Sequence, residues 1–464
     1  MDASQINAGT STEAGTVLTN LTKDRPASLR PLLEAVFAAW MQAGIPFLVL
    51  RNYDQLPDFT GNDVDVLIPP DCLKAAETSL RIAARHVGYL LHHRAQFDPL
   101  SLFVSHPSTG QQVQIDLFTR LAWRGIPLLD SSLVLARRRL RNGIAVPDPV
   151  DEAVLNLFIR LLYQGSVREK YRAGIQEVAQ FHRVAWQQRL GEIVGHQAAI
   201  QLANWASAGN WSAIEQRKWH WRWRVLRRAL ARQPGKVLAN LLYDARRLWS
   251  RWWRPPGLLV VLLGPDGSGK TTVARQLIQA MRPTFQPAKS RLGHWKPALL
   301  QLPHRKRRPP ATNPHQGQPR GRFLSVALYL IHWLEYMAGF WLVVQPVRFR
   351  NGMMVMDRYY YDFQVDPRRY RLAPPPRWIV KLYDSLPRPN LIFVLEAPLP
   401  VLRQRKTEVS EEETLRQQAG YRSLANRLPG AYLIDSARPL PQVVEILTSQ
   451  ILACLAERAN AGSP

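Results

Sequence analysis

The stretch LLVVLLGPDGSGKTTVARQLI, residues 258–278, decides the fold of the second half of this 464-residue chain. Its first six residues, 258–263, form an unbroken apolar run, which is typical of a parallel strand buried on both faces. After the glycines, the apolar residues Val273, Leu277 and Ile278 recur at helical spacing. We therefore expect a strand, a glycine-rich turn and a helix in direct succession.

The turn matches the pattern GxxxxGK[ST], which binds nucleoside triphosphates. Its glycines let backbone N–H groups point at the β- and γ-phosphates, and the N-terminus of the following helix adds positive partial charge. Lys270 can neutralise phosphate charge, and the hydroxyl of Thr271 can ligate Mg²⁺. We predict that ATP with Mg²⁺ is bound by Gly264, Gly267, Ser268, Gly269, Lys270, Thr271 and Thr272.

The composition of the whole chain limits its class. A hydrophobic content of 46% fits a globular protein, and the length suffices for two or three domains. The formal net charge of +26 indicates contact with polyanions: nucleic acid, an anionic membrane surface or phosphorylated substrates. Two cysteines, Cys72 and Cys454, are too few for a disulfide framework or a zinc site. Residues 1–25 are polar and lack a signal-peptide pattern, so we expect a disordered lead-in on a cytoplasmic protein.

Residues 26–147 are predicted to form an α+β domain that carries clustered carboxylates. The alternation in DVDV, residues 63–66, places Asp63 and Asp65 on one face of a strand. Asp116 lies in a second strand-like run, VQIDLF. Such acids can hold Mg²⁺ ions that polarise a phosphate and activate a hydroxyl, as two-metal nucleotidyl transfer requires. A solvated strand face is the alternative interpretation of the first two acids.

The segments GNDVDVLI and IDLF resemble the nucleotidyltransferase fold. The resemblance implies a nucleotide and metal site at Asp63, Asp65 and Asp116. The Gly-Ser pair that grips the triphosphate in that family is missing, and residues 50–53, LRNY, stand in its place.

Residues 148–256 are predicted to be a helical connector that ends in a basic, tryptophan-rich stretch. Residues 217–254 contain twelve Lys or Arg residues, one acid and six tryptophans. This composition suits a helix in the headgroup layer of an anionic membrane, on its inner face. A structural linker whose tryptophans pack on its neighbours is the next alternative, and a grip on single-stranded nucleic acid ranks last. Residues 255–257, PPG, mark the start of a domain at 257–464.

Residues 324–347 are apolar and long enough to cross a membrane. His332 and Glu335 lie in the middle of this segment, where lipid would disfavour both. Because the segment follows the phosphate-binding turn in the same domain, we predict a buried core helix.

Two further motifs in the C-terminal half carry charge. The run GMMVMDRYYYD, residues 352–362, reads as a buried strand that ends in Asp357 and Arg358. A strand-end acid can hold the water shell of Mg²⁺, and the arginine can bridge two phosphates. A helix after the next strand carries Arg403, Arg405 and Lys406, whose cations can cover the donor phosphates. An Asp paired with its neighbouring Arg for structure alone is the alternative.

Together, GPDGSGKTT, MDRYYYD and the arginine-bearing helix resemble the thymidylate kinase group of nucleoside monophosphate kinases over about residues 257–455. The resemblance implies a three-layer α/β P-loop domain with a parallel five-stranded sheet. The Arg-Glu-Pro-Gly segment of that group is missing, and residues 291–297, RLGHWKP, stand near its place. The working residues that it implies are Asp266, Lys270, Thr271, Asp357, Arg358, Arg403 and Arg405.

We therefore expect an ATP- and Mg²⁺-dependent kinase whose acceptor is a nucleoside monophosphate similar to dTMP. A kinase that acts on a sugar or an envelope-glycan intermediate is the first alternative. A non-catalytic ATP-binding module that regulates or anchors a membrane assembly is the second.

Overall fold

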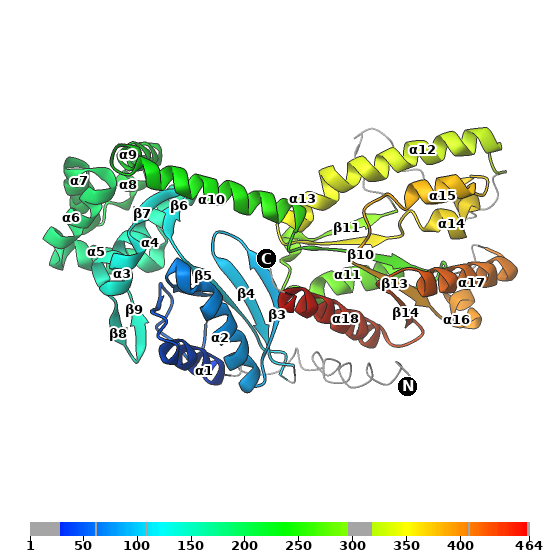
Figure 1. The fold of residues 1–464 in the computed structure, drawn as a ribbon, viewed down its shortest axis with the longest axis horizontal. Helices are drawn as coiled ribbons and strands as arrows, with labels where there is room; N and C mark the ends of the chain where they lie inside the picture. Colours follow the sequence, from blue (N-terminus) through cyan, green and yellow to red (C-terminus); the bar gives the residue numbers. More distant parts are fainter. Residues whose placement is uncertain (1–27, 61–62, 108, 296–317, 407–408, 462–464) are drawn as a thin grey trace. The chain divides into compact units, whose positions relative to one another are not determined.

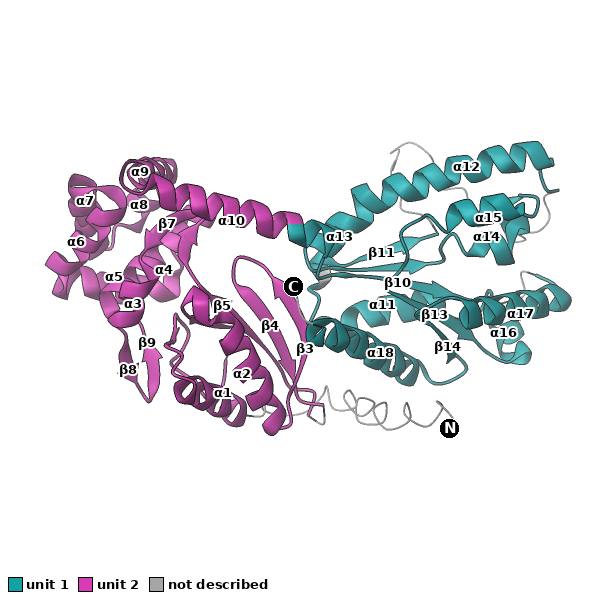
Figure 2. Cartoon of the chain, in the orientation of Figure 1, with its two compact units in different colours: residues 1–18, 250–464 teal, residues 19–249 magenta. Residues whose placement is uncertain are grey.

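The computed structural model describes residues 28–60, 63–107, 109–295, 318–406 and 409–461 (Figure 1). The predicted lead-in at residues 1–25 lies outside them. The chain divides into two compact units, of which one ends at Trp249 and the other begins at Ser250 (Figure 2). We call them the N-terminal and the C-terminal unit and describe each by itself.

The N-terminal unit begins with a five-stranded sheet in the order β1-β2-β5-β4-β3. Its strands are β1 (Leu48–Val49), β2 (Val64–Leu67), β3 (Leu90–Gln96), β4 (Leu100–Ser105) and β5 (Gln112–Phe118). Two helices, α1 (Arg30–Gln42) and α2 (Leu73–His86), bury apolar side chains such as those of Trp40 and Leu80 against one face of the sheet (Figure 1). Strands β2 and β5 run parallel, and Asp65 is paired in register with Asp116.

The rest of the N-terminal unit is mostly helical. Two hairpins and a short helix come first: β6 (Leu121–Trp123) with β7 (Ile126–Leu129), α3 (Ser131–Ala136), and β8 (Arg139–Arg141) with β9 (Ile144–Val146). The helices that follow are α4 (Pro149–Gln164), α5 (Glu169–Phe181), α6 (Arg183–Val194), α7 (His196–Ser207), α8 (Trp211–Gln216), α9 (Lys218–Arg232) and α10 (Pro234–Trp253).

Local sequence explains where these helices begin, and burial explains what holds them together. The Asp148 carboxylate caps α4 by accepting a hydrogen bond from the N–H of Val150 at 3.0 Å. Phe158 and Trp221 from the helices share one core with Leu67 of the sheet. The structure thus groups most of the predicted connector with the predicted α+β domain.

The C-terminal unit contains a five-stranded sheet in the order β11-β12-β10-β13-β14, and every pairing in it is parallel. Its strands are β10 (Leu258–Leu263), β11 (Arg291–His294), β12 (Met353–Asp357), β13 (Leu391–Glu396) and β14 (Ala431–Asp435). The helices are α11 (Lys270–Ala280), α12 (Arg322–Gly339), α13 (Gln345–Phe349), α14 (Asp362–Val365), α15 (Arg377–Tyr383), α16 (Leu399–Arg405), α17 (Glu411–Arg427) and α18 (Leu440–Asn460). The predicted parallel five-stranded sheet is therefore confirmed.

Both faces of this sheet are covered, which gives three layers. On one face, Val260 packs with Leu277 of α11 and Leu447 of α18. On the other, Val261 packs with Tyr336 of α12 and Tyr421 of α17. The unbroken apolar run of β10 therefore reflects burial on both sides, as expected for a central parallel strand.

The apolar segment predicted to be a buried helix is buried along one stripe only. Helix α12, a π-helical segment (Phe340–Val344) and α13 form a continuous helix, Arg322–Phe349, and 22% of its most apolar window is buried. Tyr329 and Tyr336 face the core, whereas Leu334 and Leu342 are exposed. The prediction of a buried core helix is wrong for most of this surface, because only one stripe of the helix, which also includes Phe340 and Val344, packs against the core.

Two helices in the described part of the chain, Arg322–Phe349 and α18, have the length and apolar composition of a membrane span. A helix that packs on the core of a soluble protein meets the same criteria.

Candidate active site

The loop after β10 adopts backbone conformations that favour glycine. Gly264 has φ of 138° and Gly267 has φ of 83°. A Cβ atom on Gly264 would lie 2.3 Å from the carbonyl oxygen of Leu395, and one on Gly267 would lie 2.8 Å from that of Leu402. The loop is therefore held closely against β13 and α16, and α11 begins directly after it at Lys270.

Lys270 lies buried within the loop. Its Nζ donates hydrogen bonds to the carbonyl oxygens of Gly264 at 2.9 Å and Pro265 at 2.7 Å, and to Oγ of Ser268 at 3.3 Å. Burial and the positive charge of Arg358 lower the pKa of Lys270 to about 8. A phosphate in the loop would offer this ammonium anionic oxygens in place of neutral carbonyls, and such charge-assisted bonds are the stronger ones.

Asp357 closes the other side of the loop from the end of β12. Oγ1 of Thr271 donates a hydrogen bond to its Oδ2, and Nδ1 of His294 lies 3.6 Å from the same oxygen. Its Oδ1 is buried and has no hydrogen-bond partner among the described residues. Burial by itself would raise the pKa of Asp357, but His294 and the charge of Lys270 hold it at about 2. An ionised carboxylate with an unpaired oxygen beside a threonine hydroxyl fits a Mg²⁺ ion.

Arg358 links the loop to a buried acid. Its Nη2 donates to Oδ1 of Asp266, and its Nη1 donates to Oδ2 of Asp362 at 2.7 Å. Arg369 donates to the second oxygen of Asp266 at 2.6 Å. Although burial opposes ionisation of Asp266, the charges of Arg358, Lys270 and Arg369 lower its pKa. We call this set of two acids and two arginines the arginine clamp.

The backbone conformation of Arg358 also indicates a functional site. This residue has φ of 77°, in the left-handed region that non-glycine residues rarely adopt, and its amide donates to the carbonyl of Leu262 at 2.9 Å. Such strain persists where surrounding contacts fix it, and it is concentrated at functional sites.

The sequence analysis gave no role to four members of this network: Asp362, Arg369, Tyr370 and Tyr421. Asp362 accepts hydrogen bonds from the hydroxyls of Tyr421 at 3.0 Å and Tyr370 at 3.1 Å as well as from Arg358. Arg369 lies in a 3₁₀ turn (Pro367–Tyr370). Asp362 is the last residue of the motif MDRYYYD, whereas no motif marks the other three positions, and only the fold brings Tyr421 to Asp362.

The structure places Arg405 near the loop, and the guanidiniums of both Arg403 and Arg405 make hydrogen bonds to carbonyl oxygens outside it. Nη1 of Arg403 donates to the carbonyl of Val409 at 2.6 Å, and Nη1 of Arg405 donates to that of Ser436 at 3.1 Å. The Cβ of Arg405 would lie 3.6 Å from a Cβ on Gly267. Their predicted role as a phosphate cover stays a prediction.

Aromatic side chains gather next to Asp357. The indole of Trp295 stacks on the ring of Tyr370 at 4.8 Å and meets the rings of His332 at 5.3 Å and Phe363 at 6.1 Å. The backbone N–H of Trp295 donates to the backbone carbonyl oxygen of Asp357 at 2.9 Å. Flat rings beside the phosphate site can stack on the planar part of an acceptor.

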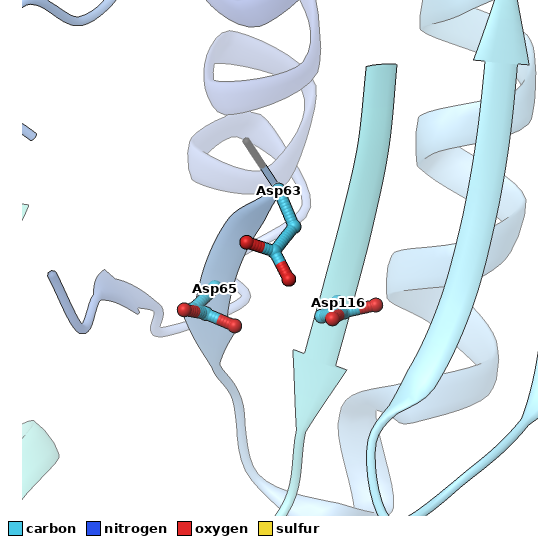
Figure 3. A group of neighbouring side chains, drawn as sticks. All are labelled: Asp63, Asp65 and Asp116. Atoms are coloured by element: carbon cyan, nitrogen blue, oxygen red, sulfur yellow. The ribbon is translucent and has the colours of Figure 1, made fainter. Parts of the chain in front are cut away.

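In the N-terminal unit the structure brings Asp63, Asp65 and Asp116 together. One oxygen from each lies within 4.8 Å of the others, with two acids on one strand segment and the third on the neighbouring strand (Figure 3). Arg51 pairs with Oδ2 of Asp65, and Gln114 donates to Oδ1 of Asp116 at 2.9 Å.

Burial dominates the electrostatics of this acid cluster. It raises the pKa of Asp116 to about 7, and it also raises that of Asp65. Oδ1 of Asp65 is buried and has no hydrogen-bond partner among the described residues. A divalent cation would satisfy that oxygen and stabilise the ionised acids, so the donor set fits Mg²⁺.

Comparisons with known proteins agree with the C-terminal site. A thymidylate kinase of Xanthomonas campestris pv. campestris (strain B100) is 27% identical over 218 residues, which are 45% of this chain and 89% of that protein. A probable thymidylate kinase of Metallosphaera sedula is 26% identical over 214 residues, 44% of this chain and 97% of that protein. The solved thymidylate kinase of Ehrlichia chaffeensis covers 41% of this chain and 97% of its own, with a TM-score of 0.30 and 15% identity. No protein-family model matches the chain.

The parallel sheet, the loop with its lysine and the Asp-Arg pair at the end of β12 define a P-loop phosphotransferase. With these relatives, the chain is a nucleoside monophosphate kinase-like enzyme whose acceptor is open, and the proteins that it is similar to are thymidylate kinases. The similarity spans less than half of the chain and does not support the nucleotidyltransferase resemblance of the N-terminal unit.

Proposed function

We propose that this protein transfers the γ-phosphoryl group of ATP to a nucleoside monophosphate, with dTMP as the first candidate acceptor. The observation that carries the proposal is the arginine clamp, because it holds Arg358 beside both Lys270 and the Thr271–Asp357 pair. The thymidylate kinase relatives favour a thymidine nucleotide over other acceptors.

Phosphoryl transfer depends mostly on positioning and on neutralising charge. The amides of the loop and Nζ of Lys270 are placed to hold the phosphates of ATP. Asp266 and Asp362 fix the guanidinium plane of Arg358 through two of its five N–H groups, which leaves the others for phosphate oxygens. Mg²⁺ held at Thr271 and near Asp357 would neutralise charge on the β- and γ-phosphates.

A screen of acceptors with γ-labelled ATP tests the proposal. The panel comprises dTMP, other nucleoside monophosphates, and simple and phosphorylated sugars. We expect label on dTMP with the formation of ADP. Label on a sugar would establish the sugar-kinase alternative instead. Binding of ATP without label on any acceptor would contradict the kinase and favour the non-catalytic module.

A second function, metal-dependent nucleotide binding, is proposed for the acid cluster of the N-terminal unit. The supporting observation is the buried unpaired oxygen of Asp65 beside two other carboxylates. Titration calorimetry should show that Mg²⁺-dependent nucleotide binding in the Lys270→Ala variant is lost on the further change Asp65→Asn. Equal heats with and without Asp65→Asn would contradict this site.

Association with the inner face of an anionic membrane is a further part of the proposal. Of the six tryptophans at residues 217–254, Trp221 is fully buried, whereas Trp219 and Trp223 are 70% and 59% exposed on α9. Exposed tryptophans among arginines suit the headgroup layer, where the rings lie at the interface. Because Trp221 belongs to the core, deletion of residues 217–254 would unfold the N-terminal unit. Such a deletion therefore does not test membrane binding.

Liposome flotation with point variants is the sharper test. We expect the protein to float with anionic vesicles at low salt, to dissociate as salt rises, and to float less as Trp219→Ala with Trp223→Ala. Trp378 is 52% exposed on α15, so Trp378→Ala is a matched control that should float normally. Equal flotation of the double variant and the wild type would contradict this membrane surface.

A further inference from the structure

The N-terminal unit contains a cleft that the acid cluster does not line. Its walls come from the β8–β9 hairpin, α4, α5 and the segment that follows β1, and its volume is about 660 Å³. Clefts of roughly 300–1,000 Å³ are the size that encloses small organic ligands. None of Asp63, Asp65 and Asp116 lines it.

One wall of the cleft is cationic. Arg139 and Arg141 project from the same face of β8, since side chains repeat every two residues along a strand. Their side chains are 61% and 58% exposed and pair with Asp148 at 2.6 Å and Asp54 at 3.3 Å. The guanidinium of Arg141 also lies 5.4 Å from the ring centre of Tyr53. Two adjacent guanidiniums held in this way can bind one phosphate through several hydrogen bonds.

The floor of the cleft is rich in acceptors and amides. The hydroxyl of Tyr53 donates to Oε2 of Glu152 at 2.5 Å, and Nδ2 of Asn156 lies 3.5 Å from its Oε1. Oδ1 of Asn52 accepts from Nζ of Lys170 at 2.6 Å and from the hydroxyl of Tyr171 at 3.0 Å. Carboxylate and amide groups together offer both the donors and the acceptors that sugar hydroxyls need.

We propose that this cleft binds a phosphorylated sugar, with its phosphate on Arg139 and Arg141 and its hydroxyls on Glu152, Asn156 and Asn52. Asp54 and Glu177 also line the cleft, so its charge is divided between a cationic wall and acidic groups. That division fits a ligand with one anionic end and a neutral, hydroxyl-bearing end better than it fits a simple polyanion. Asn52 directly follows Arg51, which pairs with Asp65, so the ligand would lie beside the acid cluster.

Titration calorimetry on the full chain tests this site. Every titration uses protein that carries Lys270→Ala, so that the loop of the C-terminal unit does not contribute phosphate binding. The probes are a hexose 1-phosphate, the free hexose, inorganic phosphate and a nucleoside 5′-monophosphate. We expect the hexose 1-phosphate to bind more tightly than each of the other three.

Variants of the lining residues show which side chains bind the phosphate of the ligand and which bind its hydroxyl groups. Arg139→Gln with Arg141→Gln should weaken binding of the hexose 1-phosphate roughly tenfold or more, as expected for lost charge-assisted hydrogen bonds. Glu152→Gln should weaken the hexose 1-phosphate and leave inorganic phosphate unchanged. Arg85 is exposed on α2, outside the cleft, so Arg85→Gln is the matched control and should bind normally. Unchanged thermal unfolding shows that each variant is folded, as expected for Arg139 and Arg141, whose side chains are more than half exposed.

Three results would overturn the proposal: no heat with the hexose 1-phosphate, equal affinity in the double arginine variant, or tighter binding of the nucleoside monophosphate than of the sugar phosphate. The inference does not rest on the kinase, because its readout needs no phosphoryl transfer and is made without Lys270. A negative acceptor screen would therefore not contradict the sugar-phosphate site. Failure of the sugar phosphate to bind would likewise not contradict the kinase.

Discussion

The Asp266 carboxylate accepts hydrogen bonds from the guanidiniums of Arg358 and Arg369. If its charge were removed, both guanidiniums would lose an ionic partner. Arg358 and Arg369 each donate to one of its oxygens, and the Arg358 side chain is 5% exposed. Loss of one partner from a buried ion pair costs about 3–5 kcal/mol. We expect Asp266→Asn to lower the rate of transfer by roughly 10- to 100-fold and to lower the urea midpoint of unfolding.

Asp435→Asn is the control for that prediction, since the Asp435 side chain is 52% exposed, pairs with an exposed Arg438 and accepts a hydrogen bond from the N–H of Ala437. Enzyme kinetics and urea unfolding measure both variants. A rate for Asp266→Asn within twofold of the wild type would mean that the arginine clamp does not position Arg358.

A second prediction at this scale concerns Gly267. Alanine there would carry a Cβ 2.8 Å from the carbonyl oxygen of Leu402 on a backbone with φ of 83°, so the loop must shift. We expect Gly267→Ala to weaken ATP binding by roughly 5- to 150-fold, an estimate that follows from about 1–3 kcal/mol of backbone strain. Gly235 has no atom within 4 Å of its Cβ position, and Gly235→Ala should bind ATP normally. Titration with ATP distinguishes the two outcomes.

Some helices and strands can be predicted from local sequence, whereas their contacts with distant residues cannot. The strand, loop and helix at residues 258–280 follow from an apolar run, glycines and a 3.6-residue period, all of which are local. The hydrogen bond of Arg369 to Asp266 joins residues 103 apart, and no local pattern encodes it. Helix α12 shows the converse, since its uniform apolar composition hides which stripe meets the sheet.

The tryptophans of α9 illustrate the same limit and give a third prediction. Trp219, Trp221 and Trp223 look alike in sequence, yet Trp221 is 0% exposed and donates to the carbonyl of Ile214 at 2.9 Å. Truncation of a buried tryptophan costs about 3–5 kcal/mol. We expect that loss of unfolding free energy for Trp221→Ala and a change within about 0.5 kcal/mol for Trp223→Ala. Urea unfolding measures both, and equal losses would contradict the packing of α9.

On the scale of the whole molecule, the two units have separate cores, and the described acid cluster lies in the N-terminal unit whereas the phosphate-binding loop lies in the C-terminal unit. The fold of the C-terminal unit and most of its phosphate site are predictable because they rest on a contiguous motif. In the N-terminal unit, the strand alternation predicts that Asp63 and Asp65 share a face. The cleft beside them cannot be predicted, because residues 52–54, from a much earlier part of the sequence, form one of its walls together with the consecutive elements β8 to α5.

Ligand-linked stability gives the prediction for the whole molecule. A ligand at 100 times its dissociation constant stabilises the unit that it binds by about 2.7 kcal/mol. In the Asp65→Asn variant, whose acid cluster should no longer bind a nucleotide, non-hydrolysable ATP with Mg²⁺ at that level should slow hydrogen exchange in the core strands from Ser250 onward and not in those before Trp249. Protection confined to the N-terminal unit would contradict the assignment of the ATP site.

The most direct test of the account compares wild type, Lys270→Ala and Lys381→Ala in the transfer of label from γ-labelled ATP to dTMP. Lys381 is exposed on α15 and serves as the matched lysine control. The account predicts that the wild type and Lys381→Ala form labelled dTDP at similar rates, whereas Lys270→Ala forms none above background. Undiminished transfer by Lys270→Ala would contradict the assignment of residues 264–272 as the site of phosphoryl transfer.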